Sequence, residues 1–236
     1  MVTDEARLAS ICCSTRGVEY RKIYMFEIKD ACLTIGRRTI VRHFSFCAPD
    51  GQISVVQGAP RSGKTLLLAA MLGFVPLAEG WVTINGEVLN PSTACFFRAQ
   101  MAYVPQTFSV PMPTTVAQVL DIVSTGWRKY EGRITIADVQ QSWPALALDP
   151  QLWQVNFNAL TPDVRKRILL SFAVCARHRV LVVDEPTEGQ TPEMAAAMMR
   201  LIKAEADKGT AVLLTTTSDE VVAEADNTIV LRGVVE

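Results

Sequence analysis

Apolar and polar residues alternate along two stretches near the start of the chain, residues 24–35 and 38–49. Alternation with a period of two is typical of strands with one buried face, so both stretches predict antiparallel strands. Residues 53–57 form a continuous apolar run rich in β-branched side chains, which predicts a strand buried on both faces. Asn85 and Gly86 stand between two apolar stretches and predict a tight hairpin. Further buried strands are expected at residues 101–106, 180–184 and 211–217, and a terminal hairpin at residues 228–236.

Helical patterns separate most of these strands. An apolar helical run follows Lys64, and residues 192–209 form another helical stretch that stops at Gly209. Between them, roughly residues 107–165 read as helix and loop without a long strand, which predicts an inserted helical subdomain. We therefore predict an α/β fold with an antiparallel β-subdomain over residues 23–236, preceded by an N-terminal extension of unknown role.

Composition narrows the function classes. With 236 residues, 49% of them hydrophobic and 20% charged, the chain is long enough for one substantial core. Its net charge of −1 disfavours nucleic acid as a partner through bulk electrostatics. The six cysteines follow no metal-ligand spacing, so reduced thiols are expected. Neither a signal peptide nor an apolar run long enough to cross a bilayer is evident, and we expect a cytoplasmic protein.

The segment GAPRSGKT has the strongest chemical meaning in the sequence. Gly58, Gly63, Lys64 and Thr65 satisfy the GxxxxGK[ST] pattern between a predicted buried strand and a predicted helix. In that context backbone amides and the helix N-terminus wrap a phosphate, the lysine reaches the β- and γ-phosphates, and the hydroxyl binds Mg²⁺. A plain glycine turn with an exposed lysine is the alternative, and the strand–loop–helix context disfavours it. We assign nucleotide binding to Gly58, Ala59, Pro60, Arg61, Ser62, Gly63, Lys64, Thr65 and Leu66.

Two adjacent carboxylates end the predicted strand at residues 180–184. Asp184 stands where phosphate-loop proteins hold the magnesium ion, and Glu185 is placed to polarise an attacking water as general base. A strand that runs into a solvated acidic loop is the alternative interpretation, which the phosphate loop makes much weaker.

The order of these segments resembles the nucleotide-binding subunits of ABC transporters, across roughly residues 25–236. GAPRSGKT is similar to their first phosphate motif, and RVLVVDEPTEG to their second motif with its catalytic glutamate. YVPQ places Gln106 where the family has a glutamine that contacts magnesium and water, which makes Gln106 a candidate catalytic residue and, with Thr65 and Asp184, a candidate Mg²⁺ ligand. Ile35 is the nearest match to the aromatic residue that stacks on adenine in the family, although it has no π face. The resemblance implies ATP and Mg²⁺ as cofactors.

Several positions depart from the family pattern. The Leu-Ser-Gly-Gly-Gln signature, which clamps the nucleotide of the opposite subunit, corresponds here to residues 160–164, LTPDV. Pro162 lacks an amide donor and Asp163 adds a negative charge, whereas Thr161, Pro162 and Asp163 together make a good helix start. The structural role of the helix is therefore expected to persist while its phosphate-binding role is lost.

Other family positions change in the same way. Residues 188–191 (EGQT) replace the segment that communicates across the dimer, and Thr217 is the nearest match to the switch histidine. Threonine has no imidazole to carry a proton. Arg61 replaces a frequent glycine, which either costs backbone freedom or adds a cation near the phosphate.

Three further charged or titratable features can be explained without a role in catalysis. His43 and His178 are expected to be structural or exposed rather than catalytic. The RKR run at residues 165–167 matches a basic turn that follows the family signature, but a solvated helix face is an equally good interpretation.

The leading hypothesis is an ATP-binding subunit of an ABC transport complex with weak or partner-dependent hydrolysis. The resemblance implies a homo- or heterodimer of ATPase subunits and transmembrane permease subunits as partners, which would hold the chain at the inner face of the membrane. Two alternatives stay open: a regulatory ATP-binding subunit with negligible turnover, and a soluble ABC protein of translation or DNA repair. A general phosphate-loop kinase is weaker still.

Overall fold

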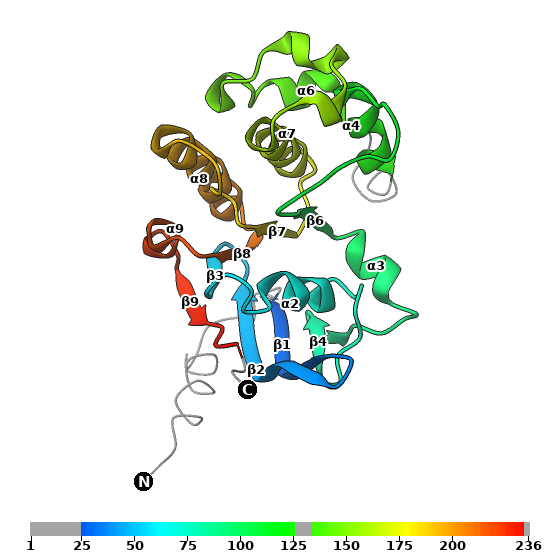
Figure 1. Cartoon of the computed structure of the whole chain (residues 1–236), viewed down its shortest axis with the longest axis vertical. Helices are drawn as coiled ribbons and strands as arrows, with labels where there is room; N and C mark the ends of the chain where they lie inside the picture. Colours follow the sequence, from blue (N-terminus) through cyan, green and yellow to red (C-terminus); the bar gives the residue numbers. More distant parts are fainter. Residues whose placement is uncertain (1–24, 126–133, 234–236) are drawn as a thin grey trace, which may run out of the picture.

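A parallel sheet of five strands forms the centre of the protein in the computed structural model, which describes residues 25–125 and 134–233 (Figure 1). Its strands follow the spatial order β6-β7-β8-β3-β9, and each neighbouring pair is parallel. The carboxyl ends of these strands therefore meet at one edge of the sheet. The strands are β3 (Ile53–Gln57), β6 (Met101–Val104), β7 (Val180–Asp184), β8 (Ala211–Thr216) and β9 (Asn227–Val230).

The three inner strands are buried on both faces, as their apolar runs predict. Ile53 and Val55 of β3 belong to one hydrophobic cluster, whereas the next residue, Val56, belongs to the other. Val183 and Val182 of β7 divide between the two clusters in the same way. Side chains alternate across a strand, so a strand without polar positions can fill a core on each side.

A second, antiparallel sheet packs beside the first, in the order β2-β1-β4-β5. The predicted Asn85–Gly86 hairpin is confirmed, since Thr83 pairs with Val88 and both turn residues have positive φ. The strands are β1 (Met25–Ile35), β2 (Arg38–Pro49), β4 (Glu79–Ile84) and β5 (Glu87–Val88).

The described elements between β6 and β7 are all helical and lie together at one end of the molecule, at the top of Figure 1. Trp143 and Trp153 stack there with ring centroids 4.3 Å apart, and the Trp143 indole donates to the Ser171 hydroxyl at 3.1 Å. These elements are α4 (Val116–Thr125), α6 (Ile136–Gln140), the 3₁₀ helices Pro144–Leu146, Pro150–Gln154 and Phe157–Ala159, and α7 (Pro162–Cys175).

The remaining helices are α2 (Lys64–Met71), α3 (Ala94–Arg98), α8 (Pro192–Asp207) and α9 (Asp219–Ala223). Helix α8 ends as predicted: Lys208 caps it and Gly209 follows with φ of 101°. The α/β fold with an antiparallel sheet and inserted helices is thus the fold expected from the sequence.

Two expectations at the chain ends have other outcomes. The segment expected to form a terminal hairpin contains β9, which pairs in parallel with β3, and residues 234–236 lie outside the described ranges. The extension at residues 1–22 also lies outside them, so the domain division at residue 22 stays a prediction. None of the helices within residues 25–125 and 134–233 is long and apolar enough to span a membrane.

Candidate nucleotide site

The loop between β3 and α2 has the geometry of a phosphate cradle. Gly63 precedes α2 with φ of 99°, and a Cβ there would stand 2.7 Å from Cγ2 of Ile40, so only glycine fits. A Cβ on Gly58 would meet the Ser62 hydroxyl at 2.6 Å. The loop therefore turns tightly and leads its backbone amides to the start of a helix, where an anion is favoured.

Arg61 lies in this loop with φ of 64°, the left-handed region that an arginine rarely adopts. The substitution of the family's glycine therefore costs backbone freedom, the first of the two alternatives considered above. The arginine itself is exposed.

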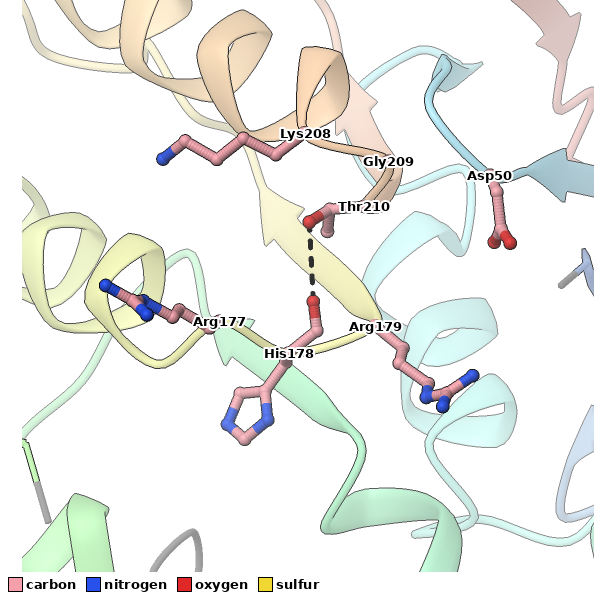
Figure 2. A pocket seen from close by; sticks show the side chains of 7 residues that line it. All are labelled: Asp50, Arg177, His178, Arg179, Lys208, Gly209 and Thr210. Carbon is pink, nitrogen blue, oxygen red and sulfur yellow. Dashed lines mark hydrogen bonds between the residues drawn. The ribbon is translucent and has the colours of Figure 1, made fainter. Parts of the chain in front are cut away.

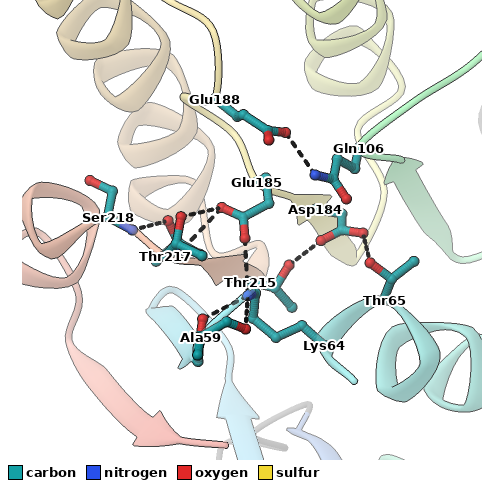
Figure 3. A network of polar contacts seen from close by, with 12 residues as sticks. Ala59, Lys64, Thr65, Gln106, Asp184, Glu185, Glu188, Thr215, Thr217 and Ser218 are labelled. Atoms are coloured by element: carbon teal, nitrogen blue, oxygen red, sulfur yellow. Dashed lines mark hydrogen bonds and ion pairs between the residues drawn. The ribbon is translucent and has the colours of Figure 1, made fainter. Parts of the chain in front are cut away.

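Lys64 is buried beneath the loop, with 6% of its surface exposed. Its ammonium donates to the carbonyl oxygens of Gly58 at 2.7 Å and Ala59 at 3.1 Å, and lies 3.2 Å from a carboxylate oxygen of Glu185 (Figure 3). The lysine is thus held at the loop by neutral acceptors and one carboxylate. A triphosphate in the cradle offers it stronger anionic partners.

Asp184 ends β7 fully buried and accepts two hydroxyl hydrogen bonds. Thr65 in α2 donates to one carboxylate oxygen at 2.8 Å, and Thr215 in β8 donates to the other (Figure 3). A carboxylate and a hydroxyl this close are the ligand types that Mg²⁺ takes in phosphate-loop sites, where phosphate and water complete the shell. These two residues fit a magnesium ion, which would neutralise charge on the transferred phosphate. In residues 25–125 and 134–233 no cluster of three His, Cys, Asp or Glu side chains offers a metal site of another kind.

Glu185 turns the chain out of β7 with φ of 50°, an unusual conformation for a residue other than glycine. The residue is 7% exposed. Its carboxylate accepts hydrogen bonds from the Thr217 amide at 3.0 Å and from the Thr217 hydroxyl at 3.4 Å. Thr217, at the switch-histidine position, therefore does contact the proposed base, but by a hydroxyl that cannot relay an imidazole proton.

Gln106 follows β6 and its side-chain amide donates to Glu188 at 2.8 Å (Figure 3). The structure thus brings Gln106 to the edge of the site but engages it with the segment that follows Glu185. Ile35 lies at the β1–β2 turn and is 59% exposed, whereas Ile40 in β2 lies close to Gly63 of the phosphate loop. Ile35 is therefore open to solvent, and an isoleucine gives the adenine of a nucleotide no aromatic ring to stack on.

Helix α7 starts at the altered signature. Thr161 is its N-cap residue, although its side chain makes no cap hydrogen bond, and Pro162 is its first residue. Asp163 is paired with Arg167 one turn later at 3.0 Å. Burial raises the pKa of the Asp163 carboxyl, but hydrogen bonds from Thr161 and Arg167 outweigh it and lower that pKa below its usual value. The negative charge is therefore retained and partly neutralised within the helix.

The RKR run is not a solvated helix face. Lys166 is 5% exposed, Arg165 donates to the Phe108 carbonyl at 3.1 Å, and Arg167 donates to the Leu146 carbonyl at 2.9 Å. Charge runs on a helix are usually exposed, so the sequence offered no sign that this one faces inward. Thr215 is a further site residue that no motif indicated, and the contact of Glu188 with Gln106 was not expected from the segment that it belongs to.

A separate pocket of about 250 Å³ lies at the opposite ends of β7 and β8 (Figure 2). It lies at the amino ends of these strands, since His178 and Thr210 come just before them. His178 is buried as expected for a structural residue, and burial lowers its pKa to about 4. The residues that line the pocket are Asp50, Arg177, His178, Arg179, Lys208, Gly209 and Thr210.

Residues 41–188 match the family model of the ABC transporter. The chain belongs to that family, and its fold is that of an ABC ATPase cassette. A solved dimeric structure of a bacterial ABC transporter cassette superposes with a TM-score of 0.76 at 17% identity, over 87% of this chain and 94% of that one.

Curated relatives are named for transport. The chain is 26% identical to the zinc transport system ATP-binding protein TroB of Treponema pallidum, over 89% of this chain and 79% of the relative. It is 27% identical to the hemin import ATP-binding protein HmuV of Rhodococcus jostii, over 77% of this chain and 62% of that protein.

Proposed function

We propose that this chain is the ATP-binding subunit of an ABC transport complex and binds ATP with Mg²⁺ at the phosphate loop. The observation that carries the proposal is the Thr65–Asp184 contact of 2.8 Å beside the buried Lys64. A hydroxyl and a carboxylate that touch across two elements, next to a loop lysine, match the magnesium and phosphate chemistry of this site. The names of the relatives support transport as the process served.

Hydrolysis is proposed to be weak or to depend on a partner. Pro162 and Asp163 remove the amide donor and the neutral surface that a signature needs to clamp a phosphate, so two copies of this chain would form two poor sites. A partner subunit with an intact signature would complete one. Permease subunits would then hold the dimer at the inner face of the membrane.

The test is ATP binding and steady-state hydrolysis by the purified chain, with and without Mg²⁺. We expect Mg²⁺-dependent binding that Lys64→Ala abolishes, and turnover little above that variant. Lys203→Ala, which removes an exposed lysine from α8, is the matched control. Binding that survives Lys64→Ala would refute the proposed site, and robust turnover would refute the loss assigned to residues 161–164.

A regulatory subunit is the second candidate, favoured by the contacts that engage Glu185. Lys64 and Thr217 both hold its carboxylate, so the proposed base is occupied within the chain. Glu185→Gln separates the two functions in the assembled complex. Loss of transport by this variant supports hydrolysis, and unchanged transport with ATP still bound supports regulation.

A further inference from the structure

Lys166 is a buried cation beside the candidate site, and the basic turn that it matches assigns it no role. It lies in the second turn of α7, 5% exposed, in a helix whose other buried residues are mostly apolar. Burial lowers its pKa to about 8, against the opposing pull of the Asp184, Glu188 and Glu185 carboxylates. A buried ammonium persists only with well-placed partners.

Its two hydrogen bonds join separate parts of the site. The Lys166 ammonium donates to the Pro105 carbonyl at 2.9 Å and to the Asp184 carbonyl at 2.6 Å. Pro105 directly precedes Gln106, and the Asp184 carbonyl belongs to the peptide bond that leads into Glu185. One side chain therefore connects α7 to the backbone directly before each of the two candidate catalytic residues.

Neighbouring contacts reinforce the same connection. Glu188 accepts from Gln106 at 2.8 Å, and Gln190 donates to the Asp163 carbonyl at 3.1 Å. Both tie the segment after Glu185 to the helical side of the protein. A pocket of about 80 Å³ lies between the start of α7 and the residues after β6, and Lys166 and Arg165, which donates to the Phe108 carbonyl at 3.1 Å, both line it. Of these two side chains, Lys166 is the one that also reaches the end of β7.

We propose that Lys166 is a positioning residue that fixes the Gln106 segment and the Asp184–Glu185 peptide relative to α7. Through it, the placement of Gln106 and Glu185 depends on α7 and not on the phosphate loop alone. It touches backbone carbonyls rather than reacting groups, so it acts through other residues. The proposal rests on the proposed ATP site, which it deepens.

Hydrogen–deuterium exchange of the full chain without nucleotide tests the proposal directly. In Lys166→Met, exchange at the amides of residues 106–108 and 185–188 should rise about tenfold or more, because a charge-assisted hydrogen bond is lost at each segment. Lys203→Met is the matched control and should leave both segments unchanged. Lys166→Arg, which keeps charge and donors, should recover part of the protection. No change at these segments, or an equal rise over the whole chain, overturns the proposal.

Lys166→Gln serves if Lys166→Met fails to fold, since it keeps a donor in a polar side chain. Its exchange is compared with that of Lys166→Arg at the same two segments, with the same criteria.

ATP binding gives an independent result. In Lys166→Met, affinity for metal-free ATP should be unchanged, because the phosphate loop stays in place. The gain in affinity that Mg²⁺ adds should fall, because the segments that carry Asp184 and Gln106 are displaced. A parallel loss of both affinities contradicts a positioning role. Failure of the wild-type chain to bind ATP refutes the proposed function instead, and the exchange experiment still decides the role of Lys166.

Discussion

The phosphate-loop region and the start of α7 have had opposite fates in this chain. The first keeps the groups proposed to bind phosphate and magnesium, with Lys64 beneath the loop and Asp184 against Thr65. The second keeps only what a helix needs, namely a cap position at Thr161, a proline and an acidic residue in the first turn. A helix start and a phosphate clamp use the same amides, and the difference shows that one requirement can survive without the other.

The largest expected effect separates the two regions by stability. Trp143→Ala should lower the free energy of unfolding by about 3–5 kcal/mol, because the indole is fully buried against Trp153 in the helical part. Denaturant unfolding measures the loss. ATP affinity under folding conditions should be unchanged if the phosphate-loop region is independent of this core.

Trp81→Ala is the control, since Trp81 is 47% exposed in the antiparallel sheet and should cost far less. Equal losses in the two variants would contradict the assignment of Trp143 to the core.

The next effect tests the two carboxylates with the same substitution. Asp184→Asn should reduce Mg²⁺-dependent ATP affinity about 100-fold, because a magnesium ligand loses its charge. Asp163→Asn should leave the affinity of the monomeric chain unchanged, since Asp163 pairs with Arg167 within α7. Titration calorimetry with and without Mg²⁺ measures both. Equal losses would mean that the regions are not separable in this way.

A pH effect at the far end of the parallel sheet comes third. Burial of the ring lowers the pKa of His178 from its ordinary value of 6.5 to about 4 in the folded chain. Between these values the unfolded chain binds the proton and the folded chain does not, so stability is complete above pH 6.5 and is lost as pH falls toward 4. This group accounts for at most about 3 kcal/mol of that loss.

His178→Gln should therefore flatten the dependence of unfolding free energy on pH in this window, measured by denaturation at several pH values. His43→Gln, which removes an exposed histidine beside Asp30, is the control. An unchanged slope in His178→Gln would show that the ring titrates normally.

The smallest effect concerns the helix start itself. Asp163→Asn should cost about 0.5–1 kcal/mol of unfolding free energy through loss of the ion pair with Arg167 and of the first-turn charge. Differential scanning calorimetry at low and high salt checks this, because screening by salt should reduce the difference in unfolding free energy between variant and wild type. A salt-independent difference would point to packing rather than charge.

The sequence predicted those parts of the molecule in which local pattern and chemistry agree. The strand that ends at Asp184 and the Asn85–Gly86 turn each have one conformation that suits their residues. The Gly58–Thr65 loop follows its motif although Arg61 adopts a φ that favours glycine. The contacts of Lys166, Thr215 and Glu188 were not predictable, because they arise where α7, β8 and the segment after β7 converge in space. The sequence of a charged run does not show whether its lysine is buried or exposed, because only the tertiary packing distinguishes the two.

The positive φ of Glu185 means that conformational stability and the proposed catalytic role favour different residues at this position. Glycine would adopt that backbone without strain, so Glu185→Gly would relieve a conformational cost while it removes the proposed base. A selection for thermal tolerance alone would therefore tend to erase the residue on which turnover is proposed to depend. Under the proposed function, the strained backbone at Glu185 is the conformational cost of a carboxylate at this position.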